Sequence, residues 1–322
     1  MASAAQVAGN AAALDHELPD GLLRYVWQEG RWQQIRLCAL AGLVFPLTMA
    51  PLELQRRIVD RAIGDSDLRL LALLGGIYFA VVLLQGGLKY LLRFYRGVIS
   101  ERAIRRLRQR LQAARAGRGA EAEGEGDGRG QTVSIVTAEV ERVGGFFGEA
   151  LSEPVLQLGI FVSILGYMLV VEPLVALVSL VFFVPQLIFV PLLQRLVNRR
   201  ARRKVELLRE VGELIVGASA DQDDRYQDRL GWIYHVRLQY YALKFLIKLL
   251  NNLLNQLAPL AVLMVGGWLV IEGDTTVGVV VAFISGFMRL ADPSRELLAY
   301  YRLAAETSVQ YRLIARWLSR PG

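Results

Sequence analysis

Six long apolar runs constrain the fold of this chain more than any other feature of its sequence. A helix needs roughly 20 apolar residues to cross the hydrocarbon of a bilayer, and backbone polar groups are satisfied there only in helices or closed barrels. The runs cover about residues 37–54, 70–92, 155–171, 174–193 and 241–271, and a sixth begins near residue 277. We therefore expect an all-α membrane protein with six transmembrane helices.

The distribution of basic residues predicts the orientation of these spans. The connections 172–173 and 272–275 contain no Lys or Arg, whereas the segments that follow the second and fourth spans are rich in both. The positive-inside rule then places both termini and both long connections in the cytoplasm. The basic residues behind the net charge of +7 lie beside the spans, and the sequence has no pattern of aromatic residues on which bases could stack. We therefore expect contact with lipid headgroups and no nucleic-acid binding.

The two long connections have a helical pattern. Apolar residues recur at spacings of three and four at Ile104, Leu107 and Leu111 in the first connection. In the second, the pattern runs through Leu196, Val205, Leu208 and Val211. At 1.5 Å per residue, such helices extend roughly 30–40 Å beyond the bilayer, and we expect them to contact a cytosolic partner.

The segments around the spans are predicted from composition. Residues 1–20 lack a basic segment followed by an apolar core, so we expect no cleaved signal peptide there, and we expect these residues to be disordered. Residues 21–36 form either an interfacial helix or the frayed start of the first span. Residues 37–318 form the six-helix domain, and 319–322 are a tail. The acidic, Gly-rich stretch 116–130 is either a solvated linker or a contact for a basic partner.

The sequence lacks the residue patterns that several kinds of chemistry require. Cys38 is the only cysteine, and His16 and His235 have no companion ligands, so neither a disulfide nor a metal site is expected. A P-loop requires Lys after Gly, and none of the four lysines, Lys89, Lys204, Lys244 and Lys248, follows one. No HExxH or GxSxG motif is present either. The sequence thus predicts no cofactor in this chain and leaves open whether it is part of an enzyme.

Three stretches resemble the transmembrane domain of type I ABC exporters. They are residues 57–64 (RIVDRAIG), residues 130–143 (GQTVSIVTAEVERV), and residues 276–283 (TVGVVVAF) followed by Asp292-Pro293. The resemblance covers about residues 21–318. It implies long cytosolic helical extensions, pairing with an identical or homologous half, and location in a bacterial inner membrane. It also implies alternating access driven by ATP and Mg on a separate ATPase subunit or domain.

In that family, the tips of the two cytosolic connections dock onto the ATPase, which by resemblance assigns coupling to Gln131, Ser134, Ser219 and Asp221. Both tips depart from the family pattern. Ile135 replaces the usual Arg, the first tip is the acidic Gly-rich stretch, and the second tip (212–226) is shortened. Because this sequence has no P-loop, the ATPase is expected to be a separate chain, a domain trimmed from this one, or a part that has been lost. If it is lost, a scaffold or regulatory subunit is the alternative function; an ion-driven secondary transporter has support only from Asp292 and Glu296.

Polar side chains at membrane depth are the candidate substrate-path residues: Gln85, Asn251, Asn255, Arg289 and Asp292. Such groups normally face a bundle interior or water. We expect them to line a central cavity; the alternative is that they pair with other helices and hold the bundle together. Asp292 can pair with Arg289 or Arg295, both three residues away, and Pro293 should loosen the helix there.

Overall fold

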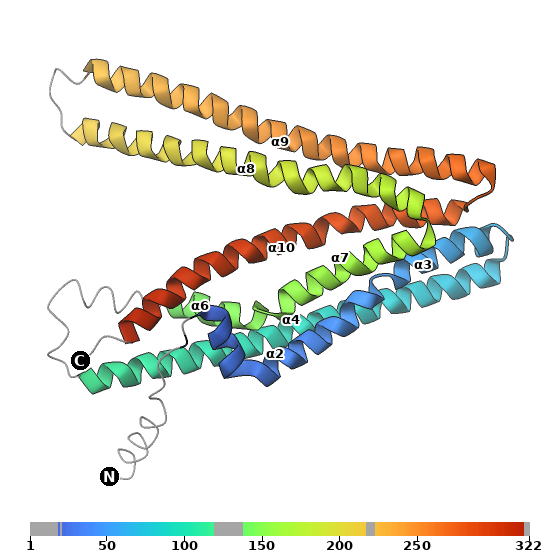
Figure 1. Ribbon diagram of the computed structural model, residues 1–322, viewed down its shortest axis with the longest axis horizontal. Helices are drawn as coiled ribbons and strands as arrows, with labels where there is room; N and C mark the ends of the chain where they lie inside the picture. Colours follow the sequence, from blue (N-terminus) through green and yellow to red (C-terminus); the bar gives the residue numbers. More distant parts are fainter. Residues whose placement is uncertain (1–18, 20, 119–137, 217–222, 319–322) are drawn as a thin grey trace, which may run out of the picture. The chain divides into compact units, whose positions relative to one another are not determined.

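The computed structural model describes residue 19 and residues 21–118, 138–216 and 223–318 (Figure 1). These residues form α-helices joined by short turns, with short π-helical stretches and no strand. The elements are α2 (Leu22–Leu47), α3 (Ala50–Arg57), the π-helix η1 (Ile58–Ile63), α4 (Leu68–Arg118), α6 (Val140–Glu149), α7 (Ser152–Val171), α8 (Pro173–Val216), α9 (Asp223–Glu272) and α10 (Val277–Leu318). The predicted all-α fold is confirmed.

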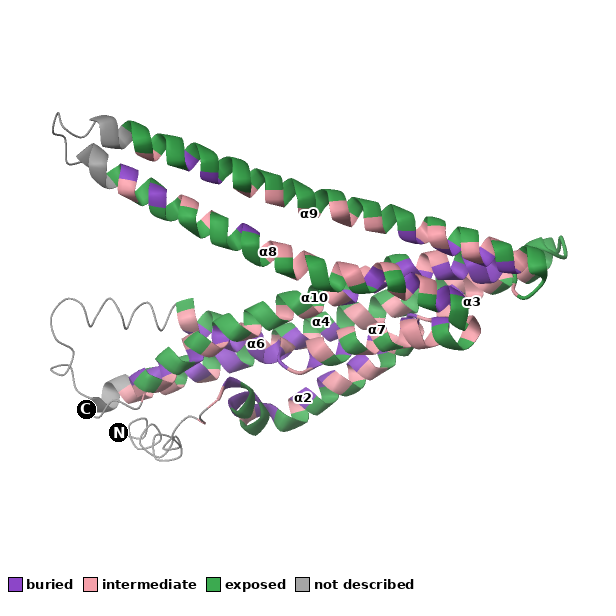
Figure 2. Ribbon diagram, turned by 45° about the horizontal axis from the view of Figure 1, so that its top comes forward, coloured by how far each residue is buried: buried purple, intermediate pink, exposed green. Residues whose placement is uncertain are grey.

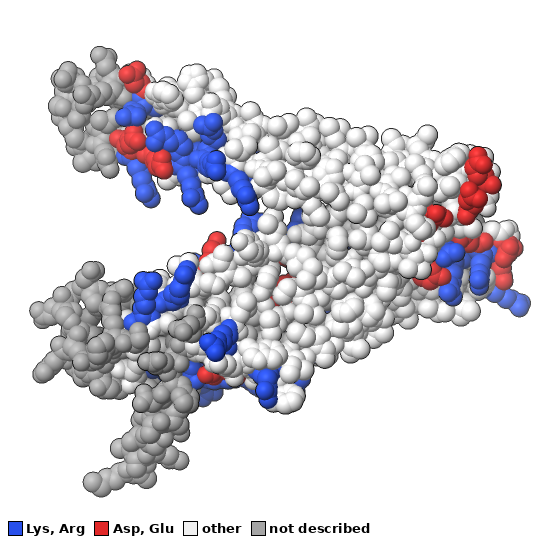
Figure 3. Space-filling model, viewed as in Figure 1, with Lys and Arg blue, Asp and Glu red and all other residues white. Residues whose placement is uncertain are grey.

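Six helical stretches among the described residues are long and apolar enough to cross a membrane. They extend well beyond the hydrocarbon. The 50 residues of α9 correspond to roughly 75 Å at 1.5 Å per residue, against a hydrocarbon thickness of about 30 Å. Figure 3 shows that charged side chains gather toward the ends of the long helices and leave a broad middle stretch largely without charge.

Local sequence explains where these helices begin, bend and turn. Asp67 caps α4, because its Oδ1 accepts hydrogen bonds from the backbone nitrogens of Arg69 and Leu70 at 2.9 and 3.1 Å. The turn after α9 contains Gly273 at a φ of +87°, a left-handed conformation that favours glycine. Within α2, Gly30 leaves helical geometry and kinks the helix. The segment predicted to be interfacial is therefore continuous with the first span across this kink.

The chain divides into two compact units, residues Met1–Tyr167 with Asp292–Gly322, and residues Met168–Ala291. Helices α7 and α10 each contribute residues to both units. We call these unit 1 and unit 2 and describe each by itself.

In unit 1, the first helical extension packs against α6. Ile104, Leu107 and Leu111, whose spacing predicted a helix, are all buried. Figure 2 shows buried positions along α6. Two glycines of α6, Gly144 and Gly148, permit the close approach. A Cβ at Gly144 would collide with the backbone of Ile104. This Gly-x-x-x-Gly spacing lets two helix backbones meet, as it does between membrane helices in general.

The start of α2 is fastened to the same unit. The Tyr25 ring packs against Phe147 at 6.0 Å and against Tyr311 of α10 at 5.3 Å between centroids. The buried Gln34 side chain donates a 2.7 Å hydrogen bond to the Phe147 carbonyl. The first turns of α2 therefore have a buried face in this unit, whereas Trp27 and Trp32 remain exposed.

In unit 2, α8 and α9 run side by side as an antiparallel pair (Figure 1). Their extensions enclose a small core of Leu207, Val211, Ile233 and Val236. The predicted helical extension is confirmed, because α8 is helical through Val216. Of the apolar residues that gave the helical pattern, Val211 is buried, whereas Leu196, Val205 and Leu208 are exposed.

Proline does not interrupt the long helices. Pro185 and Pro191 lie inside α8, Pro259 inside α9 and Pro293 inside α10. Helix α10 continues through Pro293 to Leu318. Membrane helices tolerate proline because neighbouring groups satisfy the freed backbone carbonyls.

Candidate functional site

Two predicted substrate-path residues join an amide cluster in unit 2. The Gln186 side chain of α8 donates hydrogen bonds to the Oδ1 atoms of Asn251 and Asn255 on α9, at 3.3 and 3.5 Å. Gln186 was not predicted from the sequence. It directly follows Pro185 and is an amide in an otherwise apolar run, and this pattern could have identified it. The cluster ties α8 to α9, and Asn255 remains exposed.

The ionisable candidates on α10 lie in different surroundings. Asp292 pairs with Arg295, its neighbour one turn along the helix, and both side chains are highly exposed. Arg289 is half-buried and has no ion-pair partner among the described residues. Of the two pairings that the sequence allowed for Asp292, the structure contains the one with Arg295.

Gln85 lies within the apolar stretch of α4 and is partly exposed. That stretch is unusual, because none of the residues in its most apolar window is buried within the chain. A surface of this kind in a membrane-spanning helix must be covered by lipid or by another protein surface.

The predicted coupling residues lie outside the described residues. Gln131 and Ser134 fall in the gap 119–137, and Ser219 and Asp221 fall in the gap 217–222. Most of the acidic stretch 116–130 falls in the first gap as well. Helix α8 extends to Val216 and α9 begins at Asp223, so much of the second tip region (212–226) is helical.

A buried ion pair in unit 1 was not predicted from the sequence. Arg96 of α4 pairs with Glu153 of α7, and their side chains are only 9% and 14% exposed. The Gln157 side chain donates a 2.6 Å hydrogen bond to the second oxygen of Glu153. The Glu149 carboxyl interacts electrostatically with both partners and with Glu296. Removing one partner from such a pair leaves an uncompensated buried charge, so the pair strongly fixes α4 against α7.

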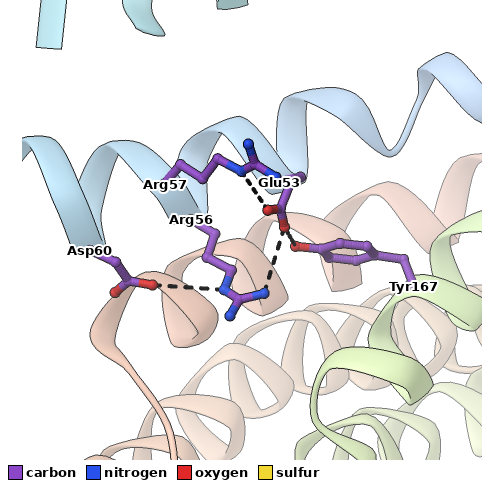
Figure 4. Close-up of polar contacts among 5 residues, drawn as sticks. All are labelled: Glu53, Arg56, Arg57, Asp60 and Tyr167. Atoms are coloured by element: carbon purple, nitrogen blue, oxygen red, sulfur yellow. Dashed lines mark hydrogen bonds and ion pairs between the residues drawn. The ribbon is translucent and has the colours of Figure 1, made fainter. Parts of the chain in front are cut away.

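A second polar cluster surrounds Glu53 near the turn between the first two spans (Figure 4). Tyr167 donates its hydroxyl to Glu53 at 3.0 Å, which connects α3 to α7. Arg57 donates to the same carboxylate at 2.7 Å, and Arg56 lies 3.7 Å from both Glu53 and Asp60. This cluster includes two residues, Arg57 and Asp60, of the stretch 57–64 that resembles the family, and the π-helical turn η1 lies within that stretch.

Ion pairs also hold the start of α2 against the extension of α4. Glu29 accepts a 2.5 Å hydrogen bond from Arg110 and lies 3.8 Å from Arg106. Arg108 pairs with Glu141 of α6 at 2.6 Å. Arginines that the sequence assigned only to membrane orientation therefore also stabilise the fold.

The described residues include no group of three or more His, Cys, Asp or Glu side chains that could hold a metal ion. The polar clusters are instead ion pairs and hydrogen-bonded amides that join neighbouring helices. Their arrangement fits a helical bundle whose parts are fixed by a few strong polar contacts.

Comparison with known proteins identifies the family. The family described as ABC transporter transmembrane region matches residues 48–216, just over half of the chain. The match begins just before α3 and extends to the end of α8. Comparison with curated proteins gave no match. The family match and the six apolar helices agree with the resemblance found in the sequence, and the chain belongs to the ABC transporter transmembrane region family.

Proposed function

We propose that this protein is the permease subunit of an ABC-type exporter in a bacterial inner membrane. Substrate would move by alternating access, driven by ATP hydrolysis on a separate subunit or domain. The observation that carries the proposal is the length of the helices in a chain of this family. Helices α4, α8 and α9 have 51, 44 and 50 residues, at least twice what a membrane requires, and rigid extensions of this kind can transmit movement from a cytosolic motor.

The proposed permease works as a pair of identical or homologous halves. Support comes from the apolar stretch of α4, where Leu73, Phe79 and Leu83 are 60%, 64% and 59% exposed. Site-directed cross-linking tests the pairing in a Cys38→Ala background, with single cysteines introduced at residues 79 and 83. A cross-linked dimer in native membranes supports the pairing, whereas a monomer at every tested position of α4 contradicts it.

Within this proposal, Gln85, Asn251, Asn255, Arg289 and Asp292 line the substrate path. The half-buried Arg289 and the exposed Asn255 support the assignment, because neither the Arg289 guanidinium nor the Asn255 amide nitrogen has a partner among the described residues. Membrane lipid would cover the remaining apolar surface, and both termini would lie in the cytoplasm. No nucleic-acid partner is expected.

The experiment that tests the motor is co-purification with ATPase measurement. The full chain is purified from its native membrane, bound ATPase polypeptides are identified, and ATP hydrolysis is measured with Mg. We expect an ATPase subunit to bind through Gln131, Ser134, Ser219 and Asp221, so a variant with these four residues changed to alanine should lose it. Ser66→Ala, in the turn between the first two spans, is the control and should retain it.

A scaffold or regulatory subunit is the second candidate function. Ile135 in place of the family's arginine and the acidic stretch 116–130 support it, because both lie where a motor would dock. Under this alternative, the purified chain carries proteins unrelated to transport, binds them equally with and without ATP, and shows no associated ATPase. That result would reject the exporter proposal.

A further inference from the structure

Basic residues have different surroundings in the two helical extensions. In unit 1, Arg96, Arg106, Arg108 and Arg110 of α4 each lie against a glutamate of another helix. In unit 2, Arg195, Arg199, Arg200 and Arg202 of α8 are all exposed, and none has a carboxylate partner among the described residues. Four arginines of α4 are thus paired within the fold, although Arg93, Arg102 and Arg105 are exposed without a carboxylate partner among the described residues, whereas none of these four arginines of α8 is paired.

The neighbouring helix adds further positive charge. Arg237, Lys244 and Lys248 of α9 are also exposed and lack a carboxylate partner in the described part of the chain. Residues 173–205 and 230–271 contain no Asp or Glu at all. Of the cations in these stretches, only Arg203 and Lys204 have partners among the described residues. Arg203 pairs with Glu206 at 3.1 Å, and Lys204 lies 5.7 Å from the Tyr240 ring centroid. We call the seven exposed cations the α8–α9 basic belt.

The contacts between the two helices place these cations at one level. Gln186 reaches Asn251 and Asn255, Lys204 lies over Tyr240, and Glu210 pairs with Arg229 at 3.0 Å. In this antiparallel register, Arg195 lies level with about residue 245 and Arg203 with about residue 237. The basic residues of α8 and α9 therefore flank the same short length of the helix pair, and Figure 3 shows Lys and Arg side chains gathered over this part of α8.

The belt begins where the uncharged part of each helix ends. Residues 173–194 of α8 and 249–271 of α9 contain no charged side chain, and each stretch is long enough to cross the hydrocarbon. Arg195 and Lys248 are the first charged residues beyond them. Exposed apolar side chains adjoin them at Leu192 and Leu196 on α8 and at Phe245 and Leu249 on α9. Positive charge next to apolar surface at the membrane boundary is complementary to an anionic amphiphile.

We propose that the α8–α9 basic belt binds anionic phospholipids of the membrane, with headgroup phosphates held by the arginines and lysines. Acyl chains would lie against Leu192, Leu196, Phe245 and Leu249. The site depends on the chain spanning a membrane and not on ATP-driven transport, so it extends beyond the proposed function and can be tested independently of it.

Native mass spectrometry of the purified full chain tests this site. The protein is released from detergent in the presence of phosphatidylglycerol or phosphatidylcholine, and the bound lipids are counted across a titration. We expect phosphatidylglycerol to bind more tightly than phosphatidylcholine. The variant R195Q/R199Q should weaken phosphatidylglycerol binding by roughly five-fold for each charge removed.

The control is R61Q/R69Q, which removes the same charge from exposed arginines flanked by Asp60, Asp65 and Asp67. It should bind phosphatidylglycerol as the unaltered protein does. If R195Q/R199Q does not fold, R237Q/K244Q removes the same number of charges from the α9 side of the belt. Equal binding of the two lipids, or unchanged phosphatidylglycerol binding in the belt variants, would overturn the proposal. Displacement of the lipid by an equal concentration of inorganic phosphate would also overturn it, since the site would then be an anion site without lipid specificity.

Discussion

Arg96 on α4 and Glu153 on α7 form a buried ion pair, although 57 residues separate them along the chain. Two further hydrogen-bonding atoms of the guanidinium, Nε and Nη2, are buried without a partner among the described residues. The pair is therefore sensitive to any change that leaves one charge alone.

We predict that Arg96→Met or Glu153→Leu alone lowers the free energy of unfolding by about 3–5 kcal/mol, since each leaves one buried charge uncompensated. The double variant should recover much of this loss. Unfolding of the purified protein in detergent, arranged as a double-mutant cycle, measures the coupling between the two residues. Additive losses would show that the two side chains act independently.

The hydroxyl of Tyr167 should contribute a smaller but measurable amount. Tyr167→Phe removes the 3.0 Å hydrogen bond to Glu53, and a bond to a charged acceptor in a membrane helix bundle is worth about 1 kcal/mol. Tyr78→Phe is the matched control, because Tyr78 accepts only a 3.5 Å hydrogen bond from Gln55. Thermal unfolding in detergent should separate the two variants, and equal stability would contradict the role given to Tyr167.

Adjacent glycines of α6 offer a sharp test of its packing against α4. Gly144→Ala should destabilise the protein by about 1–3 kcal/mol, because the new methyl group meets the Ile104 backbone. Gly145→Ala places the same group where no atom lies within 4 Å, and alanine in a helix should stabilise by up to about 1 kcal/mol. If both variants unfold at the same temperature, α4 and α6 are not in close contact.

Arg289→Ala should reduce substrate transport while leaving folding and dimerisation unchanged, because Arg289 makes no ion pair within the described residues. Arg289→Lys should retain more activity, since it keeps the positive charge. Transport in vesicles and size-exclusion chromatography are measured on the same preparations. An alanine variant that fails to fold or dimerise would assign Arg289 to the bundle and not to the substrate path.

Burial raises the pKa of the Glu139 carboxyl at the start of α6, and its Oε2 is buried without a hydrogen-bond partner in the described part of the chain. A carboxyl whose pKa is raised on folding favours the folded protein at low pH, and this contribution is lost as pH rises through the raised value. Glu139→Gln should therefore be more stable than the unaltered protein at neutral pH. The difference should vanish below the ordinary pKa of a glutamate. Thermal unfolding across this pH range measures it, and a difference that does not change with pH would contradict the prediction.

The two helical extensions show how far sequence patterns could be followed. The helical pattern of Ile104, Leu107 and Leu111 was predicted correctly, and all three residues are buried. The helix was also predicted correctly on α8, but Leu196, Val205 and Leu208, which gave the pattern, are exposed, and the buried residues are Val197, Leu207 and Val211. Periodicity indicates a helix in both cases, whereas contact with another helix decides which apolar side chains are buried.

The residues of the candidate site could be predicted from the sequence only in part, because local patterns do not show which helices meet. Asn251 and Asn255 stood out as amides at membrane depth, and their partner Gln186 lies 65 residues or more away along the chain. Arg96 was recognised only as a basic residue near a span. Its pairing with Glu153 depends on the meeting of α4 and α7, which no local pattern encodes.

The sequence by itself determined the number of spans, the all-α class, the family and the position of the basic segments. These follow from the cost of exposing backbone polar groups to hydrocarbon and from charge, which act on each segment locally. The tertiary structure decided which charges are neutralised. Four arginines of α4 meet glutamates of other helices, whereas Arg195, Arg199, Arg200 and Arg202 of α8 remain exposed beside residues 230–271 of α9, which contain no acidic residue. That difference arises because an ion pair requires two side chains within about 4 Å, and chain folding, not sequence spacing, brings distant residues that close.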